Sequence, residues 1–293
     1  MSPLSSASRA ATQECVVTSK LLIGLPEGTP QITYTNMKTL KGVIDARCRK
    51  CAKDDSQSPF LVVTSIPSIF LKHLDFDRGR RFTANLQENL AVFEVMIYPA
   101  HEVVSTGLGT EISMDISRMG LDDEIFASGS PSFIDGNGIY AQVPDASFML
   151  DDDLKWKNGR IWPILTIETG LFESESKLAI DAQRWLEVDG SRTKVVITAK
   201  LDRQAPRVTF QRWEHHLPPF RPFTRHFHPT GSVMEEVVAT HEGGITRVNG
   251  SITIPFEKVL NRARRGPNER NVVVGQNELA RLCERGWKAQ GFM

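Results

Sequence analysis

The chain has 293 residues, of which 40% are hydrophobic, and its 35 basic residues balance its 35 acidic residues. This length suits one large domain with appendages, because single hydrophobic cores stop growing near ~250–300 residues. Zero net charge argues against a uniformly basic nucleic-acid-binding protein but is compatible with a local basic groove. The sequence has no apolar run of ~18 uncharged residues and no apolar leader after Met1, so we expect an intracellular protein without membrane contact, in the cytoplasm or nucleus.

The N-terminal part is predicted to be mainly helical. Residues 1–20 are rich in Ser and Ala and are expected to form a disordered tail. Apolar residues spaced by three and four predict helices over Gln31–Lys53, Phe82–Tyr98 and about His101–Ser117. An apolar, β-branched run predicts a strand over Phe60–Ile66. We therefore expect a helical part at 31–120.

Cys48 and Cys51 form a lone CxxC pair within the first predicted helix. A structural zinc site needs a second pair of ligands, and the sequence offers no obvious one. Two helix thiols are the favoured interpretation.

The segment 125–201 follows a different pattern. Short apolar runs predict strands over Ile125–Ser128, within Ile139–Leu150, over Ile161–Thr169 and over Lys194–Leu201, with a helix over Ser174–Val188. The order strand, strand, helix, strand predicts two neighbouring parallel strands joined by a right-handed crossover through the helix. We expect this segment to be the core of the domain.

The remaining residues, 202–293, are predicted to extend the core with further strands. These are expected at Arg207–Trp213, Met234–Thr240 and Ile245–Ile254, followed by helices at Pro255–Arg265 and Glu278–Trp287. The complete expectation is a mixed α/β fold. A central mixed β-sheet is flanked by helices in a single domain at 21–293, with a helical N-terminal part and a C-terminal β extension.

Two carboxylates lie at or near the ends of predicted core strands. Asp145 follows Pro144, and Glu168 comes about twenty residues later in an otherwise apolar strand. A carboxylate in a buried strand needs a partner or a ligand. Neighbouring strands could hold the two groups close together, and paired hard oxygen ligands suit Mg²⁺ or Mn²⁺. The alternatives are a turn residue at Asp145 and a solvent-facing strand end at Glu168.

Five segments together resemble the core of the PD-(D/E)XK superfamily of restriction-endonuclease-like nucleases. They are Pro144-Asp-Ala-Ser-Phe148, Leu165-Thr-Ile-Glu-Thr-Gly170, Glu173-Ser-Glu-Ser-Lys-Leu178, Asp181-Ala-Gln-Arg-Trp-Leu186 and Lys194-Val-Val-Ile-Thr198. The likeness is closest to uncharacterised fungal proteins that carry this domain, and it covers the flanks only loosely. It implies that Asp145 and Glu168 bind Mg²⁺ or Mn²⁺ and that the protein cleaves phosphodiester bonds in DNA or RNA.

The sequence departs from the family motif at one position. The motif places a Lys two residues after the Glu, and Gly170 stands there. Members of the superfamily are known to move this Lys onto the following helix, which makes Lys177 the third catalytic candidate after Asp145 and Glu168. An acidic residue from an upstream helix often joins the metal ligands, and Glu111 is the candidate. Two other functions stay open: a catalytically inactive binding or interaction module, and a small-molecule enzyme on this fold.

A second feature is the interleaving of basic and aromatic residues between Arg203 and His228. Arginine contacts phosphate and aromatic rings stack on bases, which favours nucleic-acid binding by this segment. The alternative is a proline-braced loop whose aromatic residues pack on the core. The candidate nucleic-acid-binding residues are Arg207, Arg212, Arg221 and Arg225.

Overall fold

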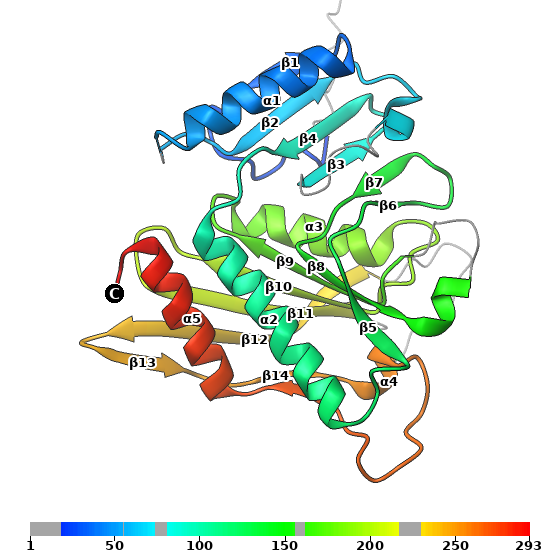
Figure 1. Cartoon of the computed structure of the whole chain (residues 1–293), viewed down its shortest axis with the longest axis vertical. Helices are drawn as coiled ribbons and strands as arrows, with labels where there is room; N and C mark the ends of the chain where they lie inside the picture. Colours follow the sequence, from blue (N-terminus) through cyan, green and yellow to red (C-terminus); the bar gives the residue numbers. More distant parts are fainter. Residues whose placement is uncertain (1–18, 55, 74–80, 156–161, 217–229) are drawn as a thin grey trace, which may run out of the picture.

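The computed structural model describes residues 19–54, 56–73, 81–155, 162–216 and 230–293. In this part of the chain the strands form three β-sheets with helices packed against them (Figure 1). The predicted mixed α/β fold class is confirmed. Of the tail predicted at 1–20, only Ser19 and Lys20 fall within the described residues. No described helix combines the length and apolarity needed to cross a bilayer.

The largest sheet has seven strands in the order β13-β12-β11-β10-β9-β8-β5. β9 (Leu165–Gly170) and β10 (Val195–Leu201) are parallel neighbours, joined through helix α3 (Glu175–Glu187), and β8 (Ala146–Leu150) runs antiparallel to β9. The predicted order of strand, strand, helix and strand is confirmed. The other strands are β5 (Ile125–Gly129), β11 (Arg207–His216), β12 (Thr230–Glu242) and β13 (Ile245–Val248).

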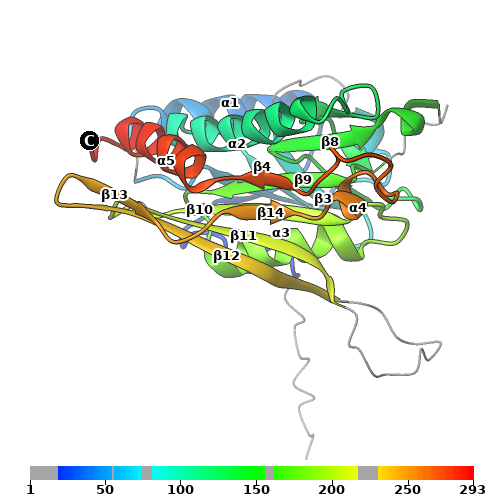
Figure 2. The ribbon, with the colours of Figure 1, turned by 90° about the horizontal axis from the view of Figure 1, so that it is seen from below.

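Helices cover both faces of this sheet, as Figure 2 shows. On one face, α2 (Pro99–Arg118) packs beside α5 (Gln276–Gln290), and the β9 side chain Ile167 lies beside Gly109 of α2. On the other face, Gly170 of β9 lies against Leu178 of α3. Residues three apart in a strand point to opposite faces, so the two contacts place the helices on opposite sides. Every residue of β9 is consequently buried.

The second sheet has six strands in the order β1-β2-β4-β3-β7-β6, and α1 (Met37–Cys51) packs on one of its faces (Figure 1). Cys48 and Cys51 both lie on α1, where the buried Cys51 thiol contacts the Ser58 carbonyl oxygen at 3.5 Å. The strands are β1 (Gln31–Thr33), β2 (Phe60–Thr64), β3 (Arg81–Asn85), β4 (Leu90–Glu94), β6 (Phe133–Ile134) and β7 (Tyr140–Gln142). The remaining elements are β14 (Ile252–Ile254), which pairs with β15 (Val272–Val274), the short helix α4 (Phe256–Val259), and 3₁₀ turns at Phe70–His73 and Asp151–Lys155.

The predicted helix over Phe82–Tyr98 is wrong, because these residues form the antiparallel hairpin β3–β4. A local turn splits the segment. The Asn85 side chain accepts hydrogen bonds from the backbone N–H groups of Gln87 and Glu88, and Asn89 adopts a left-handed φ of 52°. Asn and Asp favour such turns because their side chains bond nearby backbone groups. The part at 31–120 is therefore mixed α/β and not mainly helical.

Two C-terminal elements are also shorter than predicted. The strand expected over Ile245–Ile254 is divided into β13 and β14, which belong to different sheets. Asn249 separates them, and its side-chain oxygen accepts from the N–H of Val238 at 2.8 Å. The helix expected over Pro255–Arg265 is only the single turn of α4, which is followed by Asn261 in a left-handed conformation with φ 49°.

The first described residues cross the beginning of α3. The carbonyl oxygen of Gly24 accepts a hydrogen bond from the N–H of Ser174 at 3.2 Å, and Leu21 packs on the six-stranded sheet beside Phe60 and Val62. Gly24 has φ +75°, and a Cβ built there would lie 2.2 Å from the Ser174 hydroxyl oxygen. Only glycine fits this position, because both the conformation and the space exclude a side chain.

Replacing Gly24 by Ala should lower the free energy of unfolding by about 3 kcal/mol, from left-handed strain plus the clash with α3. Gly28 is a matched control, because it has φ +72° and a Cβ placed there would meet no atom within 4 Å. Gly28→Ala should therefore lose only about 1 kcal/mol. Urea unfolding of both variants measures the difference, and equal losses would show that the crossing over α3 adds no constraint.

Candidate active site

The site is centred on Asp145, which lies where the chain passes from one large sheet to the other. The chain leaves β7 at Gln142 and enters β8 at Ala146, and the backbone N–H of Asp145 bonds to the carbonyl oxygen of Ile167 in β9. Both predicted carboxylates, Asp145 and Glu168, thus lie at adjacent strands of one mixed sheet. Both are buried, with 8% and 9% exposure respectively.

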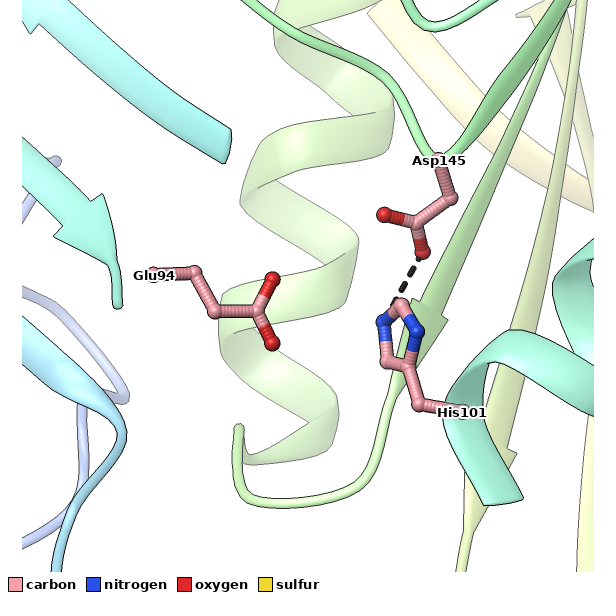
Figure 3. A group of neighbouring side chains, drawn as sticks. All are labelled: Glu94, His101 and Asp145. Carbon is pink, nitrogen blue, oxygen red and sulfur yellow. Dashed lines mark ion pairs between the residues drawn. The ribbon is translucent and has the colours of Figure 1, made fainter. Parts of the chain in front are cut away.

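The Asp145 carboxylate receives three donors from three different elements. Arg81 Nε of β3 lies 2.7 Å from one oxygen. The other oxygen contacts the N–H of Thr169 in β9 at 2.5 Å and His101 Nε2 of α2 at 3.0 Å, and Figure 3 shows the His101 contact. Burial acts to raise the pKa of Asp145, but the positive charges of His101 and Arg81 and the Thr169 hydrogen bond hold it below its ordinary value. Asp145 is therefore ionised and paired.

Glu94 at the end of β4 adds a second carboxylate beside His101. Its side chain points toward His101 and Asp145 in Figure 3, and its oxygen lies 3.6 Å from Arg81. Burial raises the pKa of Glu94 to about 7. Burial opposes the charge on His101, but the carboxylates of Asp145 and Glu94 outweigh it and raise the pKa of His101 to about 9.

Glu168 lies within β9 and faces α3. One of its oxygens accepts from the indole N–H of Trp185 and from the amide of Gln142 at 3.2 Å. Burial, followed by the charges of Asp145 and Asp181, raises the pKa of Glu168 well above its ordinary value. Glu168 therefore holds a proton more readily than an exposed glutamate does.

Lys177 lies in the first turns of α3 and is 5% exposed. Its ammonium bonds to Asp181, one helical turn later, and Asp181 also accepts from Arg184 at 2.8 Å. The Ser174 hydroxyl caps the helix by accepting from the N–H of Lys177 at 3.2 Å. This cap fixes where α3 begins and so which side of the helix Lys177 occupies.

The packing of α3 explains the glycine at the motif position for Lys. A Cβ on Gly170 would lie 2.7 Å from Leu178 Cδ1 and 3.2 Å from a Glu173 oxygen. A side chain at 170 would require the Leu178 side chain to shift, because contacts under 3.0 Å force a neighbour to move. Lys177, which precedes Leu178 on α3, lines the same small cavity as Asp145 and Glu168.

Asp145, Glu168 and Lys177 line one small cavity of about 40 Å³. This volume suits an ion or a few waters, since one water needs ~10–15 Å³ of such space. Arg81, Glu94, Gln142, Thr169, Glu173 and Asp181 line it as well. The cavity is therefore lined by five carboxyl groups and by two basic side chains, Arg81 and Lys177. Burial raises the pKa of Glu173, as it does for Glu94 and Glu168.

This donor set fits a hard divalent cation. Glu94, His101 and Asp145 each offer a ligand atom, and these atoms lie within 4.8 Å of one another. The oxygens Gln142 Oε1 and Thr169 Oγ1 are buried with no hydrogen-bond partner among the described residues. Carboxylate and amide oxygens are the ligands that Mg²⁺ and Mn²⁺ prefer, and an imidazole is better suited to a transition metal than to Mg²⁺.

The other predicted site residues lie elsewhere. Glu111 is ten residues beyond His101 on α2, about 15 Å along the helix axis. It forms an ion pair with Arg281 at 3.7 Å. Arg212 is ion-paired with Glu214 and with Glu235 at 3.3 Å. Arg207 is exposed at the start of β11 and lines a separate cleft. Arg221 and Arg225 lie outside the described residues.

Sequence reasoning missed Arg81, Glu94 and His101. The expectation of an acidic residue on an upstream helix led to Glu111, whereas the residue contributed by α2 is His101, in its first turn after Pro99. Arg81 and Glu94 fell at or inside a segment wrongly predicted as helical. Only one feature of the sequence pointed to any of these residues: Glu94 is an acidic residue at the end of an apolar run that precedes Pro99.

Comparisons with known proteins add little to this geometry. Neither a scan against protein-family models nor a search of curated proteins finds a match. Among solved structures, one similar chain is a candidate nuclease belonging to DUF820 from Anabaena variabilis. The identity is 18%, the match covers 46% of this chain and 79% of that chain, and the TM-score is 0.30. A similarity of this size is too low to assign a fold family or an activity.

The raised pKa values of Glu94 and His101 predict that the free energy of unfolding falls as pH rises in metal-free buffer. Glu94 has a folded pKa of about 7 against an ordinary 4.5, so stability falls as pH rises between these values. His101 has a folded pKa of about 9 against an ordinary 6.5, so its stabilisation is complete below 6.5 and is lost as pH rises through 9. The His101 contribution is on the order of 3 kcal/mol.

His101→Gln should therefore flatten the fall between pH 6.5 and 9 while retaining the fall at lower pH. Urea unfolding in EDTA at several pH values measures both parts. If the variant keeps the full wild-type slope above pH 7, the His101–Asp145 pair does not carry this stabilisation.

Proposed function

We propose that this protein is a PD-(D/E)XK-type nuclease that hydrolyses phosphodiester bonds of DNA or RNA with Mg²⁺ or Mn²⁺. The observation that carries the proposal is the meeting of Asp145, Glu168 and Lys177 in one buried cavity. Two adjacent strands and the helix that follows them supply the three groups. The excess of carboxyl groups over cations in this cavity supports a site for a positive ligand.

Each residue has a distinct role in the proposed reaction. Asp145 and Glu168 would hold the metal through carboxylate oxygens. Glu94 and His101 lie with Asp145 in a group whose ligand atoms are within 4.8 Å of one another, and His101 would join only after losing its proton. When bound, the metal would neutralise phosphate charge and lower the pKa of a coordinated water. The ammonium of Lys177 would stabilise the negative charge that develops on the phosphate oxygens in the transition state.

Positioning of these groups comes from their neighbours. Trp185 and Gln142 fix one oxygen of Glu168, and Asp181 holds Lys177 by an ion pair within the helix. Such supporting contacts restrict the side chains to one orientation, which lowers the reorganisation needed during the reaction.

A second candidate function is a catalytically inactive module on the same fold. Arg81 and His101 already place two positive groups against Asp145, where a metal would otherwise supply the charge. If these cations permanently replace the metal, the site stabilises the fold and the protein acts by binding. The two candidates differ in one measurable property, the affinity for a divalent cation.

Metal binding is tested first, by thermal unfolding of the full chain with and without Mn²⁺. A cation that binds only the folded protein at 100 times its dissociation constant stabilises it by about 2.7 kcal/mol, which raises the melting temperature. We expect this increase in wild type and in Glu111→Gln, and its loss in Glu168→Gln. An equal response of wild type and Glu168→Gln would favour the inactive module.

Cleavage is tested with plasmid DNA, single-stranded DNA and RNA in Mg²⁺ or Mn²⁺. Glu168→Gln should lower the rate at least 100-fold, because it removes a metal ligand while keeping the shape of the side chain. Lys177→Met should lower the rate about 10²-fold or more with unchanged Mn²⁺ affinity, since its role lies in the transition state.

Glu111→Gln serves as the matched control for cleavage, because it removes a carboxylate from α2 outside the cavity. Its rate should equal that of wild type. Absence of cleavage of all three polymers with either metal, in a protein that binds Mn²⁺, would end the nuclease proposal.

A further inference from the structure

A second, larger cavity lies beside the candidate active site. It has a volume of about 450 Å³ and is lined by Leu171, Phe172, Glu175, Lys200, Asp202, Arg203, Gln204, Arg207 and Thr209; we call it the Lys200 cleft. The turn between β9 and α3 separates the two sites, since Glu173 lines the small cavity and Phe172 and Glu175 line the cleft. A further cavity of about 200 Å³ shares Leu171, Phe172 and Arg203 with it.

The cleft contains an ammonium group held by backbone carbonyl oxygens. Lys200, near the end of β10, donates to the carbonyl oxygens of Leu171 at 3.2 Å and Leu201 at 3.1 Å. Its hydrogen bonds thus go to neutral oxygens. Burial lowers the pKa of Lys200 and outweighs the charges of Glu173, Asp202 and Glu175, which act to raise it. A half-buried cation with only neutral partners is stabilised by an anionic ligand.

The charges around Lys200 add to its preference for an anion. Arg203 and Arg207 line the same cleft, and both are exposed. Of the two acidic residues there, Asp202 is engaged locally, because one of its oxygens accepts from the N–H groups of Gln204 at 2.7 Å and Ala205 at 3.2 Å. Lys200 and Arg207 are thus the cations that an anion in the cleft would meet, opposite the exposed Glu175.

Planar groups are stacked at one wall of the cleft. The Arg203 guanidinium lies 4.0 Å from the Phe172 ring centroid, and the Tyr98 ring lies 4.7 Å from Phe172 at an interplanar angle of 33°. Arg203 is exposed, so its guanidinium extends the stack toward the open side of the cleft. Nucleobases stack on arginine planes as well as on aromatic rings.

We propose that the Lys200 cleft binds one nucleotide unit, with its phosphate at Lys200 and Arg207 and its base against Arg203. The volume lies in the range of cofactor-sized ligand sites, whereas the active-site cavity of about 40 Å³ holds no nucleotide. The inference rests on the proposed nuclease function and deepens it, because it assigns the nucleotide next to the cleaved phosphodiester to the cleft. A single strand would present such a unit with its base unpaired.

The test measures equilibrium binding to the full chain in EDTA, so that hydrolysis plays no part. The probes are adenosine 5′-monophosphate, adenosine, inorganic phosphate and a short single-stranded oligonucleotide. Adenosine monophosphate and the oligonucleotide should bind, and adenosine and phosphate should each bind at least tenfold more weakly than the monophosphate. Lys200→Met and Arg207→Ala should each weaken nucleotide binding about tenfold.

Arg247→Ala is the control, because it removes an arginine of β13, outside the cleft, and should leave binding unchanged. Arg207 is exposed, so its replacement tests the site even if Lys200→Met fails to fold. The proposal is overturned if phosphate binds as tightly as the nucleotide, or if the Arg207 variant binds like wild type.

Binding and cleavage distinguish this inference from the proposed function. A protein that binds the nucleotide through Lys200 and Arg207 but cleaves no polymer with either metal refutes the nuclease and retains the cleft. A protein that cleaves nucleic acid, with cleavage and binding unaffected by both substitutions, refutes the cleft and retains the nuclease.

Discussion

The buried carboxylate of Asp145 is the constraint on which the arrangement of the two large sheets depends. The chain crosses from β7 to β8 at this residue, and the carboxylate can be buried only if donors surround it. Arg81 comes from the six-stranded sheet, Thr169 from the seven-stranded sheet and His101 from the helix that follows β4. Satisfying one carboxylate therefore fixes three elements that are remote in the sequence.

The same constraint gives the site its chemical character. Arg81 and His101 neutralise Asp145, but Glu94, Glu168 and Glu173 remain in a cavity where burial raises the pKa of all three. Because burial favours the protonated form of these three groups, a cation bound in the cavity would have to displace protons from them. The side chains proposed to bind a cation are thus the same ones whose burial opposes negative charge in the fold.

The parts of the site that lie close together along the chain could be identified from the sequence. Asp145, Glu168 and Lys177 belong to consecutive elements, and the alternation of apolar strands with one capped helix was enough to place them at adjacent strands and on the crossover helix. The reason for Gly170 required coordinates, because the contact with Leu178 depends on how closely α3 approaches β9.

The rest of the site could not be predicted because its partners are remote. Arg81 and Glu94 belong to a hairpin whose apolar residues also fit a helical spacing, and only the Asn85 turn decides between the two structures. An acidic residue was expected on α2, which led to Glu111. The part of α2 that reaches Asp145 is its first turn, and the residue there is His101. The pairing of Arg212 with Glu235 likewise depends on the register between β11 and β12.

The crossing at Asp145 has a consequence for dividing the protein into smaller pieces. A fragment limited to 125–201 would retain every residue that resembles the nuclease motif, yet it would lack Arg81, Glu94 and His101. Its central carboxylate would then have to be protonated or exposed to water, and the crossover between strands would lose its fixed geometry. The β3–β4 hairpin and α2 precede Asp145 and β9 in the sequence, so the complete set of contacts around Asp145 can form only after β9 has been synthesised. The site therefore depends on contacts of long sequence separation, which the segment 125–201 cannot make by itself.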